Sequence, residues 1–207
     1  YFTDANNGVA VGWGGVIVRT TNGGANWVEP GHLSKTLIGV CFTNSNVGIA
    51  VGLFGSVMKT TDGGATWNAK SSGAQANFYS VFFTNKDTGN AVGNAGRILH
   101  TTNGGSEWII NEIPMGREYG FKGVHFPKGN KFKGIAVGET GVICKTSNGG
   151  TNWDTSTVGT KNLNSVFLTD TNNAIVVGNT GTILRTTDGG TTWTTQTSGT
   201  TQILTSV

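Results

Sequence analysis

The sequence has little charge, proline or cysteine: 12% of its 207 residues are charged, and it holds 3 Pro and 2 Cys. Cys41 and Cys144 have no nearby partner and no CxxC spacing, which argues against a zinc site or a disulfide framework. No apolar run approaches the roughly 18 residues that a membrane helix needs. The net charge of +3 is spread along the chain and forms no nucleic-acid-binding arm. We therefore expect no metal, no cofactor, no membrane span and no nucleic-acid partner.

Glycine, by contrast, is abundant. The chain has 34 Gly and no Gly-X-Y period, which excludes collagen. With 36% hydrophobic residues and 6 Trp it is too apolar for a disordered tail. A globular fold rich in tight turns is indicated.

One sequence pattern occurs five times. Each copy ends in a tryptophan, and these tryptophans are spaced 40, 41, 45 and 40 residues apart: Trp27, Trp67, Trp108, Trp153 and Trp193. The copies read VGWGGVIVRTTNGGANW, VGLFGSVMKTTDGGATW, VGNAGRILHTTNGGSEW, VGETGVICKTSNGGTNW and VGNTGTILRTTDGGTTW. A period of this length is typical of one four-stranded blade of a β-propeller.

Each copy divides into four short strands by alternation and turn residues. In the second copy the strands read LIGVCFT, GIAVG, SVMKT and TWNAK. No segment has the 3.6-residue apolar period of a helix. The sequence predicts an all-β, five-bladed propeller in one domain, with blades at residues 204–207 plus 1–36, 37–77, 78–120, 121–162 and 163–203.

The two ends of the chain match halves of one repeat unit. Leu204–Val207 align with Leu163–Val166, and Tyr1–Asp4 align with Phe167–Asp170. We predict that the C-terminal strand completes the first blade and closes the ring, which would remove exposed sheet edges. The alternative is five repeats of a larger propeller.

The turns before Trp67 and Trp193 fit the Asp-box pattern, Ser/Thr-x-Asp-x-Gly-x-Thr-Trp, and the other three copies have Asn at the Asp position. A short Asx side chain can accept hydrogen bonds from turn amides, while the tryptophan packs between blades. Because three copies have Asn in place of Asp, a structural role is favoured over a metal or acid site. The predicted structural residues are Asn22, Trp27, Asp62, Trp67, Asn103, Trp108, Asn148, Trp153, Asp188 and Trp193.

These boxes and the AVG-x-x-G-x-I run resemble the bacterial neuraminidase repeat superfamily, most closely the photosystem II stability/assembly-factor-like proteins. The resemblance covers essentially the whole chain and is specific for the blade. Similar boxes occur in sialidases, in xyloglucan-cleaving glycoside hydrolases and in sortilin-type receptors. The resemblance to the assembly factor implies a seven-bladed propeller that chaperones a membrane protein. This sequence has five repeats and departs from that number. The resemblance implies an extracytoplasmic location: periplasmic, secreted or cell-surface.

A basic or histidine side chain precedes each box. It is more consistent with support of its own turn or a neighbouring blade than with an anion-binding ring, because residues repeated in every unit usually serve the unit. These residues are Arg19, Lys59, His100, Lys145 and Arg185.

Ligand-binding residues are expected where the repeats differ. The turns between the second and third strands carry Trp13 and Phe54 in the first two copies, where they could anchor a protein or stack on a sugar. The connection at residues 111–120 is the longest and most charged of its kind, and it adds Arg117 and Tyr119. Packing of both aromatics under neighbouring loops is the alternative.

We predict a noncatalytic binding or scaffold module that presents this face to a protein or glycan. One alternative is a glycoside hydrolase, which needs two carboxyls across the scissile bond; its candidates are Glu112, Glu118 and Glu139. The arginine triad of a sialidase is absent from the sequence. The other alternative is a structural subunit of a cell-surface assembly.

Overall fold

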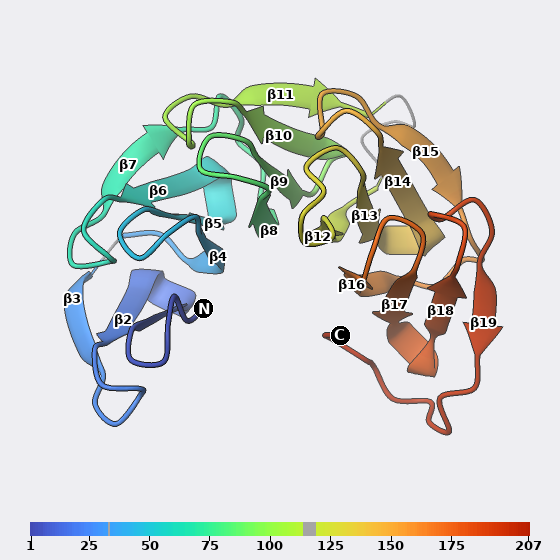
Figure 1. Ribbon diagram of the computed structural model, residues 1–207, viewed down its shortest axis with the longest axis horizontal. Helices are drawn as coiled ribbons and strands as arrows, with labels where there is room; N and C mark the ends of the chain where they lie inside the picture. The colour runs from blue at the N-terminus through green and yellow to red at the C-terminus, as the bar shows by residue number, and fades with distance from the viewer. Residues whose placement is uncertain (33, 114–118) are drawn as a thin grey trace.

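The computed structural model describes residues 1–32, 34–113 and 119–207, which form five antiparallel sheets in an arc around a common axis (Figure 1). Each sheet is one blade. The first two blades contain β1 (Gly8–Val11), β2 (Val16–Thr20), β3 (Val28–His32), β4 (Leu37–Phe42), β5 (Gly48–Gly52), β6 (Ser56–Thr60) and β7 (Asn68–Ser71). The third and fourth contain β8 (Phe78–Phe83), β9 (Gly89–Gly93), β10 (Arg97–Thr101), β11 (Ile109–Glu112), β12 (Phe121–His125), β13 (Gly134–Gly138), β14 (Val142–Thr146) and β15 (Asp154–Thr157). The fifth contains β16 (Leu163–Leu168), β17 (Ala174–Gly178), β18 (Ile183–Thr186) and β19 (Thr194–Gln196).

The predicted all-β, five-bladed propeller architecture is confirmed. In the last four blades the strands pair in chain order, each joined to the next by a turn, and the first strand lies nearest the axis (Figure 1). In four blades the turn between the second and third strands is a short 3₁₀ segment: η1 (Trp13–Gly15), η2 (Leu53–Gly55), η3 (Glu139–Gly141) and η4 (Asn179–Gly181).

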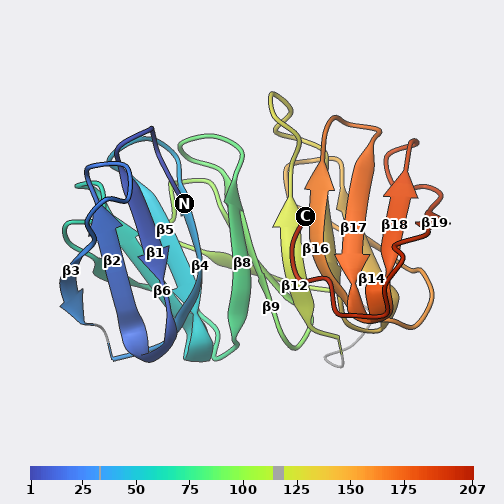
Figure 2. The ribbon, with the colours of Figure 1, turned by 90° about the horizontal axis from the view of Figure 1, so that it is seen from below.

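The predicted closure by the C-terminal strand is corrected by the structure. The first sheet has three strands, and Phe2 adds a single bridge to Gly8. The Leu204 N–H donates to the Gly178 carbonyl of the fifth blade, just as the Leu37 N–H donates to Gly12 between the first two blades. Leu204 therefore occupies the start of an inner strand, as the repeat alignment predicted, but residues 204–207 form no strand of the first sheet. The rotation from blade to blade is too small for five blades to bring the ends together (Figures 1 and 2).

A contact between phenylalanine, glycine and tryptophan recurs in four blades. In the third blade the Phe83 ring lies over Gly89, where a Cβ would come within 2.7 Å of ring atoms. The same ring meets Trp108 edge-on, with centroids 6.0 Å apart and planes at 84°. The equivalent ring pairs are Phe2–Trp27, Phe42–Trp67 and Phe126–Trp153. Glycine is required at the start of the second strand because the ring occupies the space of a side chain.

The cores lie between blades rather than within one sheet. The second strands β5, β9 and β13 are buried along their whole length, because each has a neighbouring blade on both faces. One core cluster joins Ile49 of the second blade to Phe83 and Leu99 of the third. A single blade could not bury these faces alone, so the stack of blades folds as a unit.

The turn between the third and fourth strands is built the same way in all five blades. In the second blade, Asp62 Oδ1 accepts hydrogen bonds from Thr60 Oγ1 at 2.8 Å and the Thr66 N–H at 2.9 Å. Thr60 Oγ1 also accepts from the Gly64 N–H at 2.9 Å. Asn22, Asn103 and Asn148 receive the equivalent backbone hydrogen bond with an amide oxygen. The carboxylate therefore serves the turn, and an amide can replace it.

We expect Trp153→Ala to lower the free energy of unfolding by about 3–5 kcal/mol, since it empties a large buried site. Trp153 is 7% exposed and bonds through Nε1 to the Gly150 carbonyl at 3.1 Å. The matched control is Trp27→Ala, because Trp27 is 42% exposed in the first blade. Urea unfolding measures both, and equal losses would contradict the described packing.

Acid unfolding tests the two turn carboxylates. Hydrogen bonds from Thr66 lower the pKa of Asp62 to about 2, and those from Thr192 lower the pKa of Asp188. Unfolded Asp titrates near about 3.9, so their stabilising contribution is present above about pH 4 and is lost as the pH falls toward about 2. The variant Asp62→Asn/Asp188→Asn should therefore lose less thermal stability than the wild type across this interval. An equal fall in melting temperature for the variant and the wild type between pH 5 and pH 2 would contradict this role of the two carboxylates.

Candidate functional site

The turns between second and third strands gather at one end of the propeller, here called the loop face (residues 12–16, 52–56, 93–97, 138–142 and 178–182). Trp13 and Phe54 stand on this face in adjacent blades, 80% and 69% exposed. Phe54 also has a left-handed backbone, with φ of 54°. Such a conformation costs a non-glycine residue about 1–2 kcal/mol. At these exposures neither aromatic side chain packs into the core.

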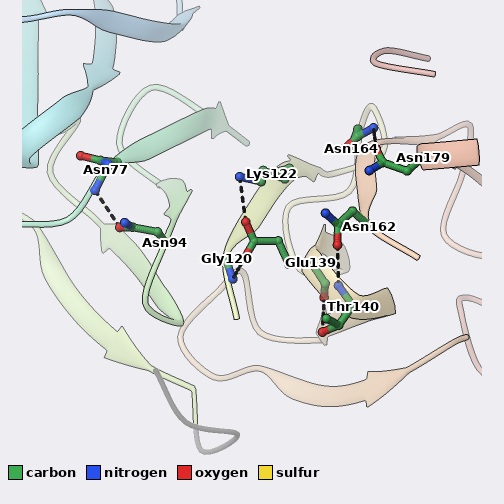
Figure 3. A network of polar contacts seen from close by, with 9 residues as sticks. All are labelled: Asn77, Asn94, Gly120, Lys122, Glu139, Thr140, Asn162, Asn164 and Asn179. Carbon is green, nitrogen blue, oxygen red and sulfur yellow. Dashed lines mark hydrogen bonds and ion pairs between the residues drawn. The ribbon is translucent and has the colours of Figure 1, made fainter. Parts of the chain in front are cut away.

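Hydrogen bonds from the next blade hold these turns in place. The Phe54 N–H donates to Asn77 Oδ1 at 2.9 Å. The Thr140 N–H donates in the same way to Asn162 Oδ1 at 3.0 Å (Figure 3). Thr36 Oγ1 accepts from the Gly14 N–H in the first turn at 3.1 Å. The accepting residue always stands just before an inner strand. Each turn is thus fixed in position across a blade interface while its outward side chain is free to vary.

Glu139 occupies the first position of its turn and makes two contacts. Its Oε2 accepts from the Gly120 N–H at 3.0 Å, and its Oε1 lies 3.0 Å from Lys122 Nζ (Figure 3). Lys122 Nζ also lies 4.2 Å from the centroid of the Tyr79 ring in the third blade. Asn94 has the same task in its own blade, since its Oδ1 accepts from the Asn77 N–H at 2.8 Å. Glu139 therefore anchors the start of an inner strand.

Among the remaining predicted site residues, Tyr119 is the one whose side chain the structure describes. Tyr119 is half-buried against the core shared by the third and fourth blades, and its carbonyl accepts from the Gly96 N–H at 2.7 Å. Arg117 and Glu118 lie outside the described residues. Glu112 ends β11, and only its backbone is described. The loop-face prediction thus rests on Trp13 and Phe54.

The residues that precede the predicted boxes support neighbouring turns. Arg19 Nε donates to the Gly63 carbonyl of the second blade at 2.9 Å. Lys59 Nζ bonds to Ser106 Oγ of the third blade at 3.0 Å. These contacts favour the structural interpretation of this ring of side chains over anion binding.

Sequence reasoning missed Lys122, Tyr79, Asn77 and Asn162. A signal was present, because all four stand at or beside the start of an inner strand, where the aligned repeats differ. Across residues 1–32, 34–113 and 119–207, no three His, Cys, Asp or Glu side chains come together as a metal site would require. Within the same ranges no helix is long and apolar enough to cross a membrane.

Sequence comparison assigns the chain to a family. It matches the family described as photosynthesis system II assembly factor YCF48 over residues 31–109 and 72–206, which together span most of its length. The chain belongs to this family. No curated protein matches the sequence.

Several solved structures share the fold. YCF48 from Cyanidioschyzon merolae has a TM-score of 0.68 at 18% identity, covering 92% of this chain and 69% of that one. The structure of YCF48 bound to D1 peptide has a TM-score of 0.52 at 17% identity, covering 94% and 78%. A GH74 enzyme from Niastella koreensis has a TM-score of 0.69 at 17% identity, covering 89% of this chain but 34% of the enzyme. At these identities the likeness is one of fold.

Replacing Glu139 separates anchoring from acid chemistry. Glu139→Ala should cost about 1–3 kcal/mol, because the buried Gly120 N–H loses its acceptor. Glu139→Gln keeps an acceptor oxygen, so we expect it to retain most of that stability. Chemical unfolding of both variants checks this, and equal losses would show that the charge on Lys122 matters more than the hydrogen bond.

Proposed function

We propose that this protein is a noncatalytic, protein-binding propeller whose loop face docks a partner polypeptide, with Trp13 and Phe54 as anchors. The proposal extends to an extracytoplasmic setting, as the family resemblance implies. The observation that carries it is the pair of large, exposed aromatic side chains in adjacent blades. Aromatic anchors of this kind supply much of the binding energy of protein interfaces.

The construction of the loop face supports this proposal. Asn77 fixes the backbone of Phe54, so the aromatic ring is presented from a rigid turn rather than from a mobile loop. A pre-organised anchor loses less conformational freedom when a partner binds.

Family membership supports a polypeptide as the partner class. A family member of the same fold, YCF48, has been solved bound to D1 peptide. Hydrolysis receives less support, because Glu139, the candidate acid whose side chain is described, is already held by Lys122 and Gly120. The likeness to GH74 enzymes concerns the blade fold alone.

Peptide display tests the proposal directly. A random peptide library is selected on the immobilised wild-type chain, and the selected peptides are measured by fluorescence anisotropy. We expect Trp13→Ala/Phe54→Ala to weaken their binding about tenfold or more, since each anchor contributes on the order of 1–2 kcal/mol. The melting temperature should change little, because neither side chain is buried.

Matched controls use apolar side chains of similar exposure on outer strands, Val28→Ala and Ile109→Ala. These variants should bind as the wild type does. Selected peptides that bind Trp13→Ala/Phe54→Ala as tightly as the wild type would contradict the loop-face assignment. Retention of glycans without any peptide binding would favour a glycan partner, and new reducing ends on a polysaccharide panel would show an enzyme.

A further inference from the structure

A second site lies at the opposite end of the inner strands from the loop face. A cavity of about 580 Å³ opens where β8, β12 and β16 end, under the hairpin that follows β12. Figure 2 shows this hairpin, residues 126–133, projecting beyond its neighbours. Cavities of this size commonly hold ligands or the anchoring side chains of partners. The lining joins three blades, so the site exists only in the folded propeller.

An aromatic ladder forms one wall of this cavity. The His125 ring lies between Phe82 and Phe167, with centroids 4.9 and 4.6 Å away. These three residues hold the same position in the inner strands of the third, fourth and fifth blades. Phe167 is 43% exposed, so part of the ladder is open to a ligand. Aromatic faces and edges of this kind favour another aromatic ring.

The His125 side chain adds one polar group to the apolar wall. The Leu168 N–H donates to His125 Nδ1 at 3.1 Å, which requires that Nδ1 carry no proton. Burial lowers the pKa of His125 to about 4, so the ring is neutral near pH 7 and its proton is on Nε2. Among the described residues Nε2 has no hydrogen-bond partner. It remains available as a donor to an acceptor atom of a ligand.

The hairpin above the cavity carries positive charge. Lys128 is the single charged residue of the lining, and the same hairpin carries the exposed Lys131 and Lys133. Asp170, which follows Thr169 at the rim, is committed to its own turn through the Asn172 and Asn173 backbone N–H groups. The three lysines of the hairpin therefore attract acidic ligands. Lys131 and Lys133 stand outside the lining, so a ligand that reaches them must extend beyond the cavity.

We propose that this cavity binds an acidic polypeptide segment, inserting one aromatic side chain against Phe82, His125 and Phe167 while flanking carboxylates pair with Lys128, Lys131 and Lys133. The site is separate from the loop face. It does not depend on the function proposed above.

The probe is a short fluorescein-labelled peptide with a central phenylalanine flanked by aspartates. We expect it to bind the wild-type chain, and to bind about tenfold or more weakly to Phe167→Ala, which removes a partly exposed ring without emptying the core. Lys128→Gln/Lys131→Gln/Lys133→Gln should weaken binding and flatten its salt dependence. Lys35→Gln/Lys161→Gln, which removes two exposed lysines elsewhere, is the control for a general loss of positive charge.

Two altered peptides test the ligand chemistry. Replacing the phenylalanine by alanine, or the aspartates by asparagines, should each abolish most of the binding. Equal affinity for either altered peptide would overturn the proposal, as would failure of the wild-type chain to bind the probe. N-acetylphenylalanine binding as tightly as the peptide would also overturn it, because a small aromatic acid would then suffice.

The loop-face variant Trp13→Ala/Phe54→Ala separates the two sites. It should bind the acidic probe as the wild type does. Loss of binding in this variant but not in Phe167→Ala would place the peptide on the loop face and overturn the cavity assignment, while leaving the loop-face function intact. Circular dichroism melts of all variants exclude unfolding as the cause of any loss.

Discussion

The packing of a phenylalanine ring on a glycine and against a tryptophan edge is the contact on which each blade depends. In the third blade this contact joins the end of β8 to the start of β9 and to the turn after β10. Phe83, Gly89 and Trp108 thus fix the relative positions of these three parts of the sheet. The fifth blade keeps the arrangement with different sizes, since Leu168 pairs with Ala174 and shares a core with Trp193. A smaller side chain opposite a larger one preserves the volume that a core requires.

Because these contacts fix each sheet, both ends of the inner strands are rigid platforms for side chains. At one end, asparagine and threonine side chains of the following blade hold the turns that display Trp13 and Phe54. At the other end, three equivalent strand positions bring Phe82, His125 and Phe167 into contact. Both platforms combine groups from different blades, so neither would exist in an isolated repeat.

The repeats made the fold predictable, because local turn chemistry and strand alternation agreed in all five copies. They also predicted the exposed Trp13 and Phe54, which break the pattern at a turn. The closure was predicted wrongly, because the alignment of the two ends shows that they fit halves of one repeat but does not show how far each blade is turned from the one before it (Figure 1). The ion pair of Lys122 with Glu139 and the His125 ladder join residues that are distant in the sequence. Differences between the aligned repeats mark the position of Lys122, but they do not identify its partner.

The left-handed position in the loop-face turns carries different residues in different blades: Gly14, Phe54, Ala95, Thr140 and Thr180. Glycine alone suits this backbone, yet the turn persists with an aromatic and with β-branched side chains because its neighbours hold it. The non-glycine residues hold nearly the same φ, from 52° to 55°, so the turn keeps its shape with an aromatic, a methyl or a β-branched side chain. Evolution can therefore alter the recognition surface of this propeller by single substitutions, without compensating changes in the blades beneath.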